Sequence, residues 1–263
     1  MATDGQGAAL ITGASMGIGL ELARVFARHQ HPVVLVARSR DKLEALAAEL
    51  RERHAVTAWV IEADLADEKA PQAIFDEVER QAIQVDYLVN NAGFGSTGRF
   101  VDADYGRQLD MIRVNVTALT ALTHLFGRKM VERRQGGVLN IASTAGFPPG
   151  PNMAVYYATK AFVVSFTEAI AHELRATGVR VTAYCPGPVS TEFPRIAGNA
   201  ETKLFKAGSV AAPHRVAEDA YRALMQGKVV KIQGFMNWIS VQVLRVSPRS
   251  WVRSIVGWIN ATH

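Results

Sequence analysis

The chain has 263 residues, of which 49% are hydrophobic, and we expect one well-buried α/β domain over residues 1–263. Its single cysteine, Cys185, excludes a framework of intramolecular disulfides, and the lack of CxxC and HExxH patterns argues against a bound metal. The first residues lack the basic and apolar segments of a signal peptide, and no apolar run approaches about 18 residues. We therefore expect a cytoplasmic protein without a membrane span.

The formal net charge of +5 is unevenly distributed. The segment 221–263 contains six basic residues and no acidic one, so it contributes +6 and leaves −1 for the rest of the chain. Binding of nucleic acid would call for a stripe of Lys and Arg with interleaved aromatic residues across the fold, so we expect no such partner. The six residues are Arg222, Lys228, Lys231, Arg245, Arg249 and Arg253.

A glycine-rich turn follows the first predicted strand. The apolar run 8–11 precedes the segment 12–19 (TGASMGIG), and the periodic apolar residues of a helix come after it. Gly13 allows a tight turn, Gly17 lets the backbone approach a pyrophosphate, and Gly19 permits close packing of helix on sheet. The free N–H groups at the start of the helix favour phosphate. Strand, turn and helix together predict a nucleotide-binding site.

Strand and helix patterns alternate along the rest of the chain. This alternation implies βαβ units with right-handed crossovers. We therefore predict a doubly wound parallel sheet (Rossmann-type) of about seven strands with helices on both faces. Further strands are predicted near 32–37, 57–61, 85–89, 137–143, 179–184 and 228–232, and helices near 41–53, 68–81, 105–131 and 155–175.

Polar and glycine-rich residues follow six of the predicted strands. In parallel sheets of this kind, ligands bind outside the carboxyl ends of the strands. We expect a site along this edge, formed by the glycine turn, Arg38, Asp64, Asn91-Ala92-Gly93, Ser143 and Pro186-Gly187-Pro188.

Tyr156 and Lys160 are four residues apart in a predicted helix, so their side chains share one face. A free tyrosine has a pKa near ~10, and an adjacent cation favours the phenolate and moves this pKa toward neutrality. The pair therefore suits proton transfer, although an exposed tyrosine and lysine would give the same spacing. Ser143 lies thirteen residues before Tyr156, across a proline-rich turn, so its hydroxyl could face the phenol.

In these motifs the chain resembles the short-chain dehydrogenase/reductase family: TGxxxGxG at 12–19, NNAG at 90–93, the serine with YxxxK, and Pro186-Gly187. The resemblance covers about residues 7–235 and implies that Ser143 polarises a substrate carbonyl, Tyr156 transfers the proton, and Lys160 lowers the pKa of Tyr156 and binds the nicotinamide ribose. It also implies that Asn115 holds a water in the proton relay. The cofactor contacts that it implies are Gly13, Ser15, Met16, Gly17, Ile18, Gly19, Arg38, Ser39, Asp64, Leu65, Asn91, Ala92, Gly93, Tyr156, Lys160, Pro186, Gly187, Val189 and Thr191.

Each of these assignments has an alternative. Thr144 could replace Ser143, and Asn115 could be a structural amide. Asp64 could cap a helix instead of contacting an adenine ring. We interpret Tyr157 as pocket wall or core.

The end of the second strand predicts the preferred cofactor. Sites selective for NAD place an acid there to bind the ribose 2′-OH. This chain has Arg38-Ser39, which suit a 2′-phosphate through charge-assisted hydrogen bonds. We therefore favour NADP(H) over NAD(H), although Met16 takes a position where some NADP-specific relatives carry a basic residue.

Two segments bear on substrate and partners. Residues 189–213, with Phe193, Ile196, Leu204 and Phe205, resemble the substrate-covering loop of the family and favour a hydrophobic carbonyl or alcohol substrate. The basic, apolar C-terminal extension 236–263 contains three tryptophans, and Ser247-Pro248 is expected to start a helix there. This extension packs on the substrate rim or a neighbouring subunit, or it docks on an anionic membrane surface as a peripheral contact.

The leading interpretation is an NADP(H)-dependent oxidoreductase that interconverts a carbonyl and an alcohol on a hydrophobic small molecule, with the proton from Tyr156. The alternatives are an epimerase or dehydratase of the same fold, with Glu192 as a candidate acid, and a non-catalytic nucleotide sensor or scaffold. Family resemblance further implies a homodimer or homotetramer formed through the helices near 105–131 and 155–175.

Overall fold

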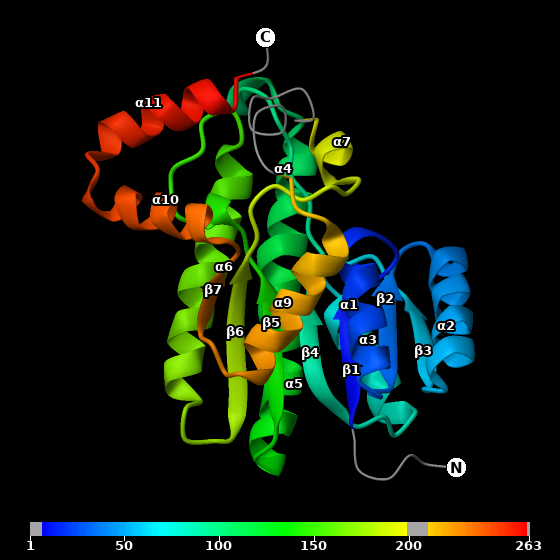
Figure 1. Ribbon diagram of the computed structural model, residues 1–263. Coiled ribbons are helices and arrows are strands. Elements are labelled where there is room, and N and C mark those ends of the chain that lie inside the picture. The colour runs from blue at the N-terminus through cyan, green and yellow to red at the C-terminus, as the bar shows by residue number, and fades with distance from the viewer. Residues whose placement is uncertain (1–6, 199–209, 262–263) are drawn as a thin grey trace.

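The computed structural model describes residues 7–198 and 210–261. Seven parallel strands form one sheet in the order β3-β2-β1-β4-β5-β6-β7, which confirms the predicted doubly wound fold. Figure 1 shows the strands running upward, with their carboxyl ends along the upper edge. The strands are β1 (Ala8–Thr12), β2 (Val33–Ala37), β3 (Ala58–Glu62), β4 (Val85–Asn90), β5 (Gly136–Ile141), β6 (Val179–Cys185) and β7 (Val230–Ile232).

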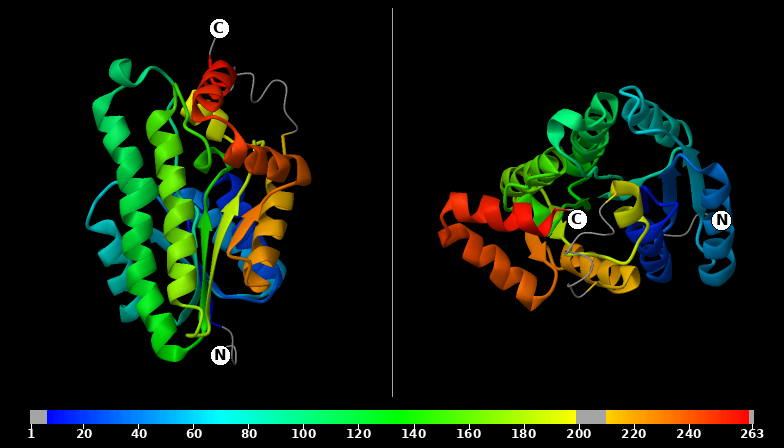
Figure 2. Two further views of the ribbon diagram at one scale, coloured as in Figure 1. Left: turned by 90° about the vertical axis from the view of Figure 1, so that its left-hand side faces the viewer. Right: turned by 90° about the horizontal axis from the view of Figure 1, so that it is seen from above.

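Helices cover both faces of the sheet, and Figure 2 shows the three layers from the side. Successive strand residues point to opposite faces, so Ile11 packs in the cluster under α1, α2 and α9, whereas Leu10 packs in the cluster under α3, α5 and α6. These helices are α1 (Gly17–Arg28), α2 (Arg40–His54), α3 (Ala70–Arg80), α5 (Leu119–Arg133), α6 (Ala154–Glu173) and α9 (Pro213–Met225).

The long helix predicted over 105–131 is present, but its middle is irregular. It consists of α4 (Tyr105–Ile112), the π-helical segment η2 (Arg113–Ala118) and α5. The buried Asn115 side chain lies within η2 and binds the backbone of Phe94 and the hydroxyl of Thr159. Apolar periodicity alone does not reveal such a local change of helical pitch.

The segment 189–213 is described in part. A parallel bridge joins Val189 to Ala211 and closes the base of the segment, and the short helix α7 (Phe193–Ala197) follows its first arm. Leu204 and Phe205, which we predicted to cover substrate, lie outside the described residues.

The C-terminal extension forms two helices, α10 (Phe235–Val246) and α11 (Arg249–Ile259). Figures 1 and 2 show that they make a hairpin standing away from the α/β body beyond β7 and α6. A helix does start after Ser247-Pro248, but the expectation that Ser247 is its N-cap and Pro248 its first residue was wrong. Pro248 takes the N-cap position of α11, and the Ser247 hydroxyl donates to the carbonyl oxygen of Val243 in α10.

Candidate active site

The glycine turn is tied to the end of β4 through Thr12. The Thr12 hydroxyl accepts hydrogen bonds from the backbone N–H groups of Asn91 and Ala92, both at 3.0 Å. The Asn91 side chain donates back to the carbonyl oxygen of Thr12 at 2.9 Å. These bonds connect two neighbouring strand ends and hold the turn beside the NNAG segment.

Two glycines in this turn are required by geometry. Gly13 has φ +66°, and a Cβ atom there would lie 2.9 Å from the side-chain nitrogen of Asn91. A Cβ atom at Gly19 would lie 2.3 Å from the carbonyl oxygen of Gly13. Gly19 therefore allows the first turn of α1 to approach the loop. No described side chain caps the N-terminus of α1, so its N–H groups are available to an anion.

Arg38 and Asp64 follow β2 and β3, which are adjacent in the sheet. The Arg38 Nη1 atom lies 3.8 Å from Oδ2 of Asp64, and 77% of the arginine side chain is exposed. The other carboxylate oxygen of Asp64 accepts from the N–H group of Ala66 at 3.0 Å. The alternative that Asp64 caps a helix was wrong, because α3 begins only at Ala70 with Lys69 at its N-cap position. Asp64 closes a turn before that helix and borders the cavity beside Arg38.

Ser143, Tyr156 and Lys160 meet where β5 ends against α6. Ser143 comes two residues after β5, and its hydroxyl accepts from the N–H group of Ala145 at 3.1 Å. Tyr156 and Lys160 are buried on one face of α6, and the Lys160 ammonium lies 5.9 Å from the centre of the Tyr156 ring. The ammonium donates to the carbonyl oxygen of Ile141 at 2.7 Å, which fixes the side chain to the end of β5.

Burial controls the protonation of this pair. It raises the pKa of Tyr156 well above the usual range, and the side-chain hydrogen bond with Ser143 lowers it by less. Burial also lowers the pKa of Lys160 to about 8. We expected Lys160 to move the pKa of Tyr156 toward neutrality, but the Lys160 ammonium is directed at the Ile141 carbonyl oxygen and the loss of solvent dominates the pKa of Tyr156. The phenol is therefore protonated at neutral pH.

Asn115 supports the wall of the site from behind. Its Oδ1 atom accepts from the N–H group of Phe94 at 3.1 Å, and its Nδ2 atom donates to the Phe94 carbonyl oxygen and the Thr159 hydroxyl, each at 3.0 Å. With these three hydrogen bonds Asn115 acts as a structural amide, which was the alternative interpretation of this residue. Its participation in a proton relay stays a prediction.

A cavity of about 960 Å³ runs along the carboxyl edge from the glycine turn to the C-terminal hairpin. Of the predicted site residues, Gly19 and Asn115 are not among those lining the cavity. The predicted residues that do line it are Gly13, Ser15, Met16, Gly17, Ile18, Arg38, Ser39, Asp64, Leu65, Asn91, Ala92, Gly93, Ser143, Tyr156, Lys160, Pro186, Gly187, Val189 and Thr191.

Further lining residues include three that the sequence analysis named as alternatives and one that it did not. Tyr157 lines the cavity, in agreement with its interpretation as pocket wall, and Thr144 does so too. Glu192 also borders it, paired with Arg195 at 2.6 Å. Arg107 contributes a cation that stacks over Phe94 and donates to the Ile196 carbonyl oxygen at 2.8 Å. The sequence offered no motif for Arg107.

The C-terminal hairpin supplies the far wall of the cavity. Val252 and Val256 of α11 are buried in one cluster with Met153 and Tyr156, which agrees with the alternative that the extension packs on the substrate rim. The apolar periodicity of the C-terminal extension indicated a packing helix, but it did not identify which of its residues face the cavity. These are Asn237, Ser240, Val241 and Leu244 from α10, and Ile255, Val256 and Ile259 from α11.

Comparison with known proteins places this site in a family. The sequence model described as short chain dehydrogenase matches residues 7–201. Sulfoacetaldehyde reductase 2 of Chromohalobacter salexigens is 39% identical over 186 residues, which make up 70% of this chain and 73% of that protein.

Solved structures agree with this result over more of the chain. A short-chain dehydrogenase from Sphingobium yanoikuyae in complex with NADPH has 33% identity and a TM-score of 0.82, covering 91% of this chain and 93% of that one. A 7β-hydroxysteroid dehydrogenase has 28% identity and a TM-score of 0.86, covering 95% and 96%. The chain therefore belongs to the short-chain dehydrogenase/reductase family of NAD(P)-dependent oxidoreductases, which act on carbonyl and alcohol groups.

Proposed function

We propose that this protein is an NADP(H)-dependent oxidoreductase that interconverts a carbonyl and an alcohol on a hydrophobic small molecule. One observation carries the proposal. A single cavity connects the glycine turn, which suits a pyrophosphate, with Ser143 and Tyr156, and it continues into an apolar chamber under the C-terminal hairpin. A dinucleotide and a substrate could therefore meet at the Tyr156 hydroxyl.

The residues at the glycine turn fit a dinucleotide. Gly13 and Gly17 both have positive φ, +66° and +59°. A Cβ atom at either residue would make a close contact, with Asn91 in the case of Gly13 and with Thr191 in the case of Gly17. The uncapped N-terminus of α1 offers N–H groups to the pyrophosphate. Lys160 would hold the nicotinamide ribose, and the segment 186–191 borders the same part of the cavity.

The nicotinamide, when bound, supplies or accepts the hydride. Ser143 orients and polarises the substrate carbonyl through its hydroxyl. Tyr156 donates its phenolic proton to the carbonyl oxygen during reduction and accepts a proton during oxidation. The Lys160 ammonium, whose pKa is lowered to about 8 by burial, provides positive charge near the phenolate that forms.

Arg38 supports the choice of NADP(H). It lies at the cavity with most of its side chain exposed, next to Ser39 and without an acid at the end of β2 itself. A guanidinium binds a phosphate dianion well through charge-assisted hydrogen bonds. The similarity to a dehydrogenase in complex with NADPH agrees with this preference.

The substrate chamber supports a hydrophobic compound. Apolar side chains from four separate parts of the chain line it, and the structural similarity to a 7β-hydroxysteroid dehydrogenase is in keeping with a bulky alicyclic ketone. The lining apolar residues include Phe94, Met153, Phe193, Leu244 and Val256.

We further propose a homodimer or homotetramer formed through the helices near 105–131 and 155–175. On α6 the ring of Phe162 is exposed and stacks on Phe166 at 5.5 Å between ring centres. Phe166 is partly buried, so the exposed ring of Phe162 is the part that suits burial against another subunit.

The test combines binding with turnover. Purified protein should bind NADPH more tightly than NADH in a fluorescence titration, and it should oxidise NADPH in the presence of bulky hydrophobic ketones, read at the nicotinamide absorbance. If both cofactors bind but no carbonyl or alcohol in a broad panel is converted, the oxidoreductase proposal fails and the nucleotide sensor is favoured.

A further inference from the structure

The outer side of the C-terminal hairpin is unusually apolar for a surface. Eight of the sixteen exposed large hydrophobic residues within the described ranges lie between residues 235 and 258. We call these eight the hairpin surface. Scattered single apolar residues are normal on a protein, but a concentration of this kind marks an interaction site. The hairpin surface consists of Phe235, Met236, Trp238, Val243 and Val246 on α10, and Trp251, Ile255 and Trp258 on α11.

Helical spacing arranges part of this surface into a stripe. Trp251, Ile255 and Trp258 occupy positions i, i+4 and i+7 of α11, so they share one face, and they are 68%, 58% and 63% exposed. The buried residues Val252 and Val256 of the same helix take another face, toward the body. The helix therefore has an inner and an outer apolar side.

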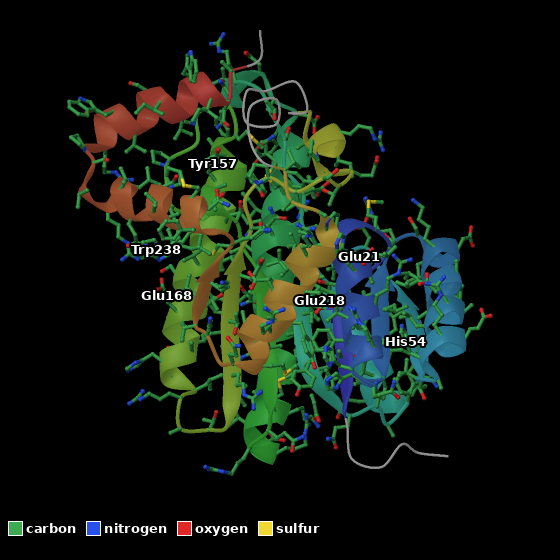
Figure 3. The ribbon with its side chains drawn as sticks, in the orientation of Figure 1. Glu21, His54, Tyr157, Glu168, Glu218 and Trp238 are labelled. Atoms are coloured by element: carbon green, nitrogen blue, oxygen red, sulfur yellow. The ribbon has the colours of Figure 1, made fainter. Side chains whose placement is uncertain are left out.

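The same arrangement holds on α10. Val241 is buried, whereas Phe235 and Trp238 are exposed and stack with their ring centres 6.1 Å apart. Figure 3 shows Trp238 on the side of α10 away from α11. Val246, the last residue of α10 before the turn, is 85% exposed, the highest value among the exposed large hydrophobic residues that the structure describes.

Cations surround this turn. Arg245, Arg249 and Arg253 are all exposed, and none of them forms an ion pair with a described residue. The whole segment 221–263 contains no Asp or Glu. A partner that covers the hairpin surface must therefore provide both apolar surface and negative charge.

Charge argues against a second copy of the chain as that partner. A twofold interface places the same patch of both subunits together. It would bring the arginines of two hairpins near each other with no acidic residue in the segment to neutralise them, and like charges across an interface are costly. An anionic lipid bilayer supplies what the surface lacks, because tryptophan and arginine suit the interfacial region and the acyl chains accept the apolar residues.

The hairpin surface lies next to the mouth of the cavity, so docking would affect access of substrate. Ile255 is exposed on the hairpin surface and also lines the cavity, so this surface reaches the cavity mouth. Val241, Leu244 and Val256 line the cavity on the inner side of the same two helices. Docking would place the mouth next to the bilayer, where lipophilic compounds are concentrated.

We propose that the hairpin surface docks on an anionic lipid bilayer by its turn and its outer apolar face. No helix in the described part of the chain has the length and hydropathy to cross a membrane. The contact is therefore interfacial, and screening by salt should weaken it.

The first test measures binding of the full-length protein to vesicles by co-sedimentation. We expect binding to phosphatidylcholine vesicles that contain about a third phosphatidylserine, at low salt, and little binding to pure phosphatidylcholine. Raising the salt concentration should release the protein. Tryptophan emission should shift to the blue on binding, since exposed indole rings enter a less polar medium.

The second test removes charge and apolar area separately. The triple variant Arg245→Gln, Arg249→Gln and Arg253→Gln should lose about a hundredfold in partitioning, since each cation near an anionic surface contributes roughly fivefold. The double variant Val246→Ser and Trp251→Ser, called the serine pair, should bind weakly to vesicles with or without phosphatidylserine. A matched control with the same change of charge is Lys42→Gln, Lys69→Gln and Arg215→Gln, at exposed positions on α2, before α3 and on α9.

None of the five altered hairpin residues lines the cavity, so turnover of a water-soluble ketone and the thermal midpoint should stay near wild type. Absence of vesicle binding by the wild type at low salt overturns the proposal. So does a control triple that loses as much binding as the arginine triple. If the serine pair instead converts a dimer to a monomer while vesicle binding is unchanged, the surface is a subunit interface and the proposal also fails.

Discussion

Asn260, just after α11, is hydrogen-bonded to Tyr157, the residue next to Tyr156 in sequence. The Tyr157 hydroxyl donates to Oδ1 of Asn260 at 3.2 Å, and Nδ2 of Asn260 donates to the carbonyl oxygen of Pro151 at 3.1 Å. Only 1% of Asn260 is exposed. This buried contact ties the last turn of the hairpin to the helix that carries the proposed proton donor, and Figure 3 shows Tyr157 at the end of α6 that faces the hairpin.

We therefore expect Asn260→Ala to destabilise the protein and loosen the cavity wall. It leaves the Tyr157 hydroxyl and the Pro151 carbonyl without these partners, which costs about 1–3 kcal/mol of the free energy of unfolding. The KM for a bulky ketone should rise several-fold with kcat little changed. Urea unfolding and steady-state kinetics measure both effects. A double-mutant cycle with Tyr157→Phe should give a coupling energy of about 0.5–3 kcal/mol, and strict additivity would contradict the contact.

Tyr156→Phe should abolish turnover and leave cofactor binding nearly intact, because the ring keeps its packing and only the transferable proton is lost. General acid catalysis contributes about 10²–10⁴-fold, so kcat should fall by that factor. Tyr157→Phe is the matched control and should reduce kcat far less. If Tyr156→Phe retained more than about a tenth of the wild-type rate, Tyr156 would not be the proton donor.

Arg38→Asp should shift the preference from NADPH toward NADH, since an acid at this position accepts from a ribose 2′-OH and repels a 2′-phosphate. Loss of one charge-assisted contact corresponds to about ten- to a hundredfold in relative affinity. Arg40→Asp is the control, because Arg40 pairs with Glu44 and does not line the cavity. Equal affinity of the wild type for the two cofactors would refute the role of Arg38.

The pH dependence of reduction should follow Lys160. Burial raises the pKa of Tyr156, so its phenol stays protonated through the neutral range, whereas Lys160 has a pKa of about 8. The ammonium is charged below this value and neutral above it. We therefore expect kcat/KM for carbonyl reduction to fall as the pH rises through about 8. A profile that stays level to pH 10 would contradict this assignment.

The parts of the fold and site that follow from local spacing could be predicted from sequence. The glycine turn lies in the segment 12–19, and Tyr156 and Lys160 are one helical turn apart, so a short window contains all that the geometry needs. Strand ends meet at one edge of any parallel sheet, which is why Arg38, Asp64 and Asn91 could be expected near one cavity.

Features that depend on distant packing could not be predicted. Tyr157 and Asn260 are 103 residues apart, and no periodicity connects them. Arg107 lines the cavity beside its hydrogen-bond partner Ile196, which is 89 residues away in the sequence. The pKa of Tyr156 is set by burial, which a sequence pattern does not measure, and the charge of Lys160 is directed to a backbone carbonyl that no motif contains.

The π-helical segment η2 sets the phase between the two halves of one long helix. Met111, in α4, packs in the cluster beside the cavity, whereas Leu122 and Phe126, in α5, pack in the cluster beneath the sheet. One residue corresponds to about 100° of rotation about a helix axis. Deleting a single residue from η2 would restore a regular α-helix, and one of these two faces would then turn away from its cluster. The shape of the substrate wall and the register of the core are thus coupled through a single irregular turn.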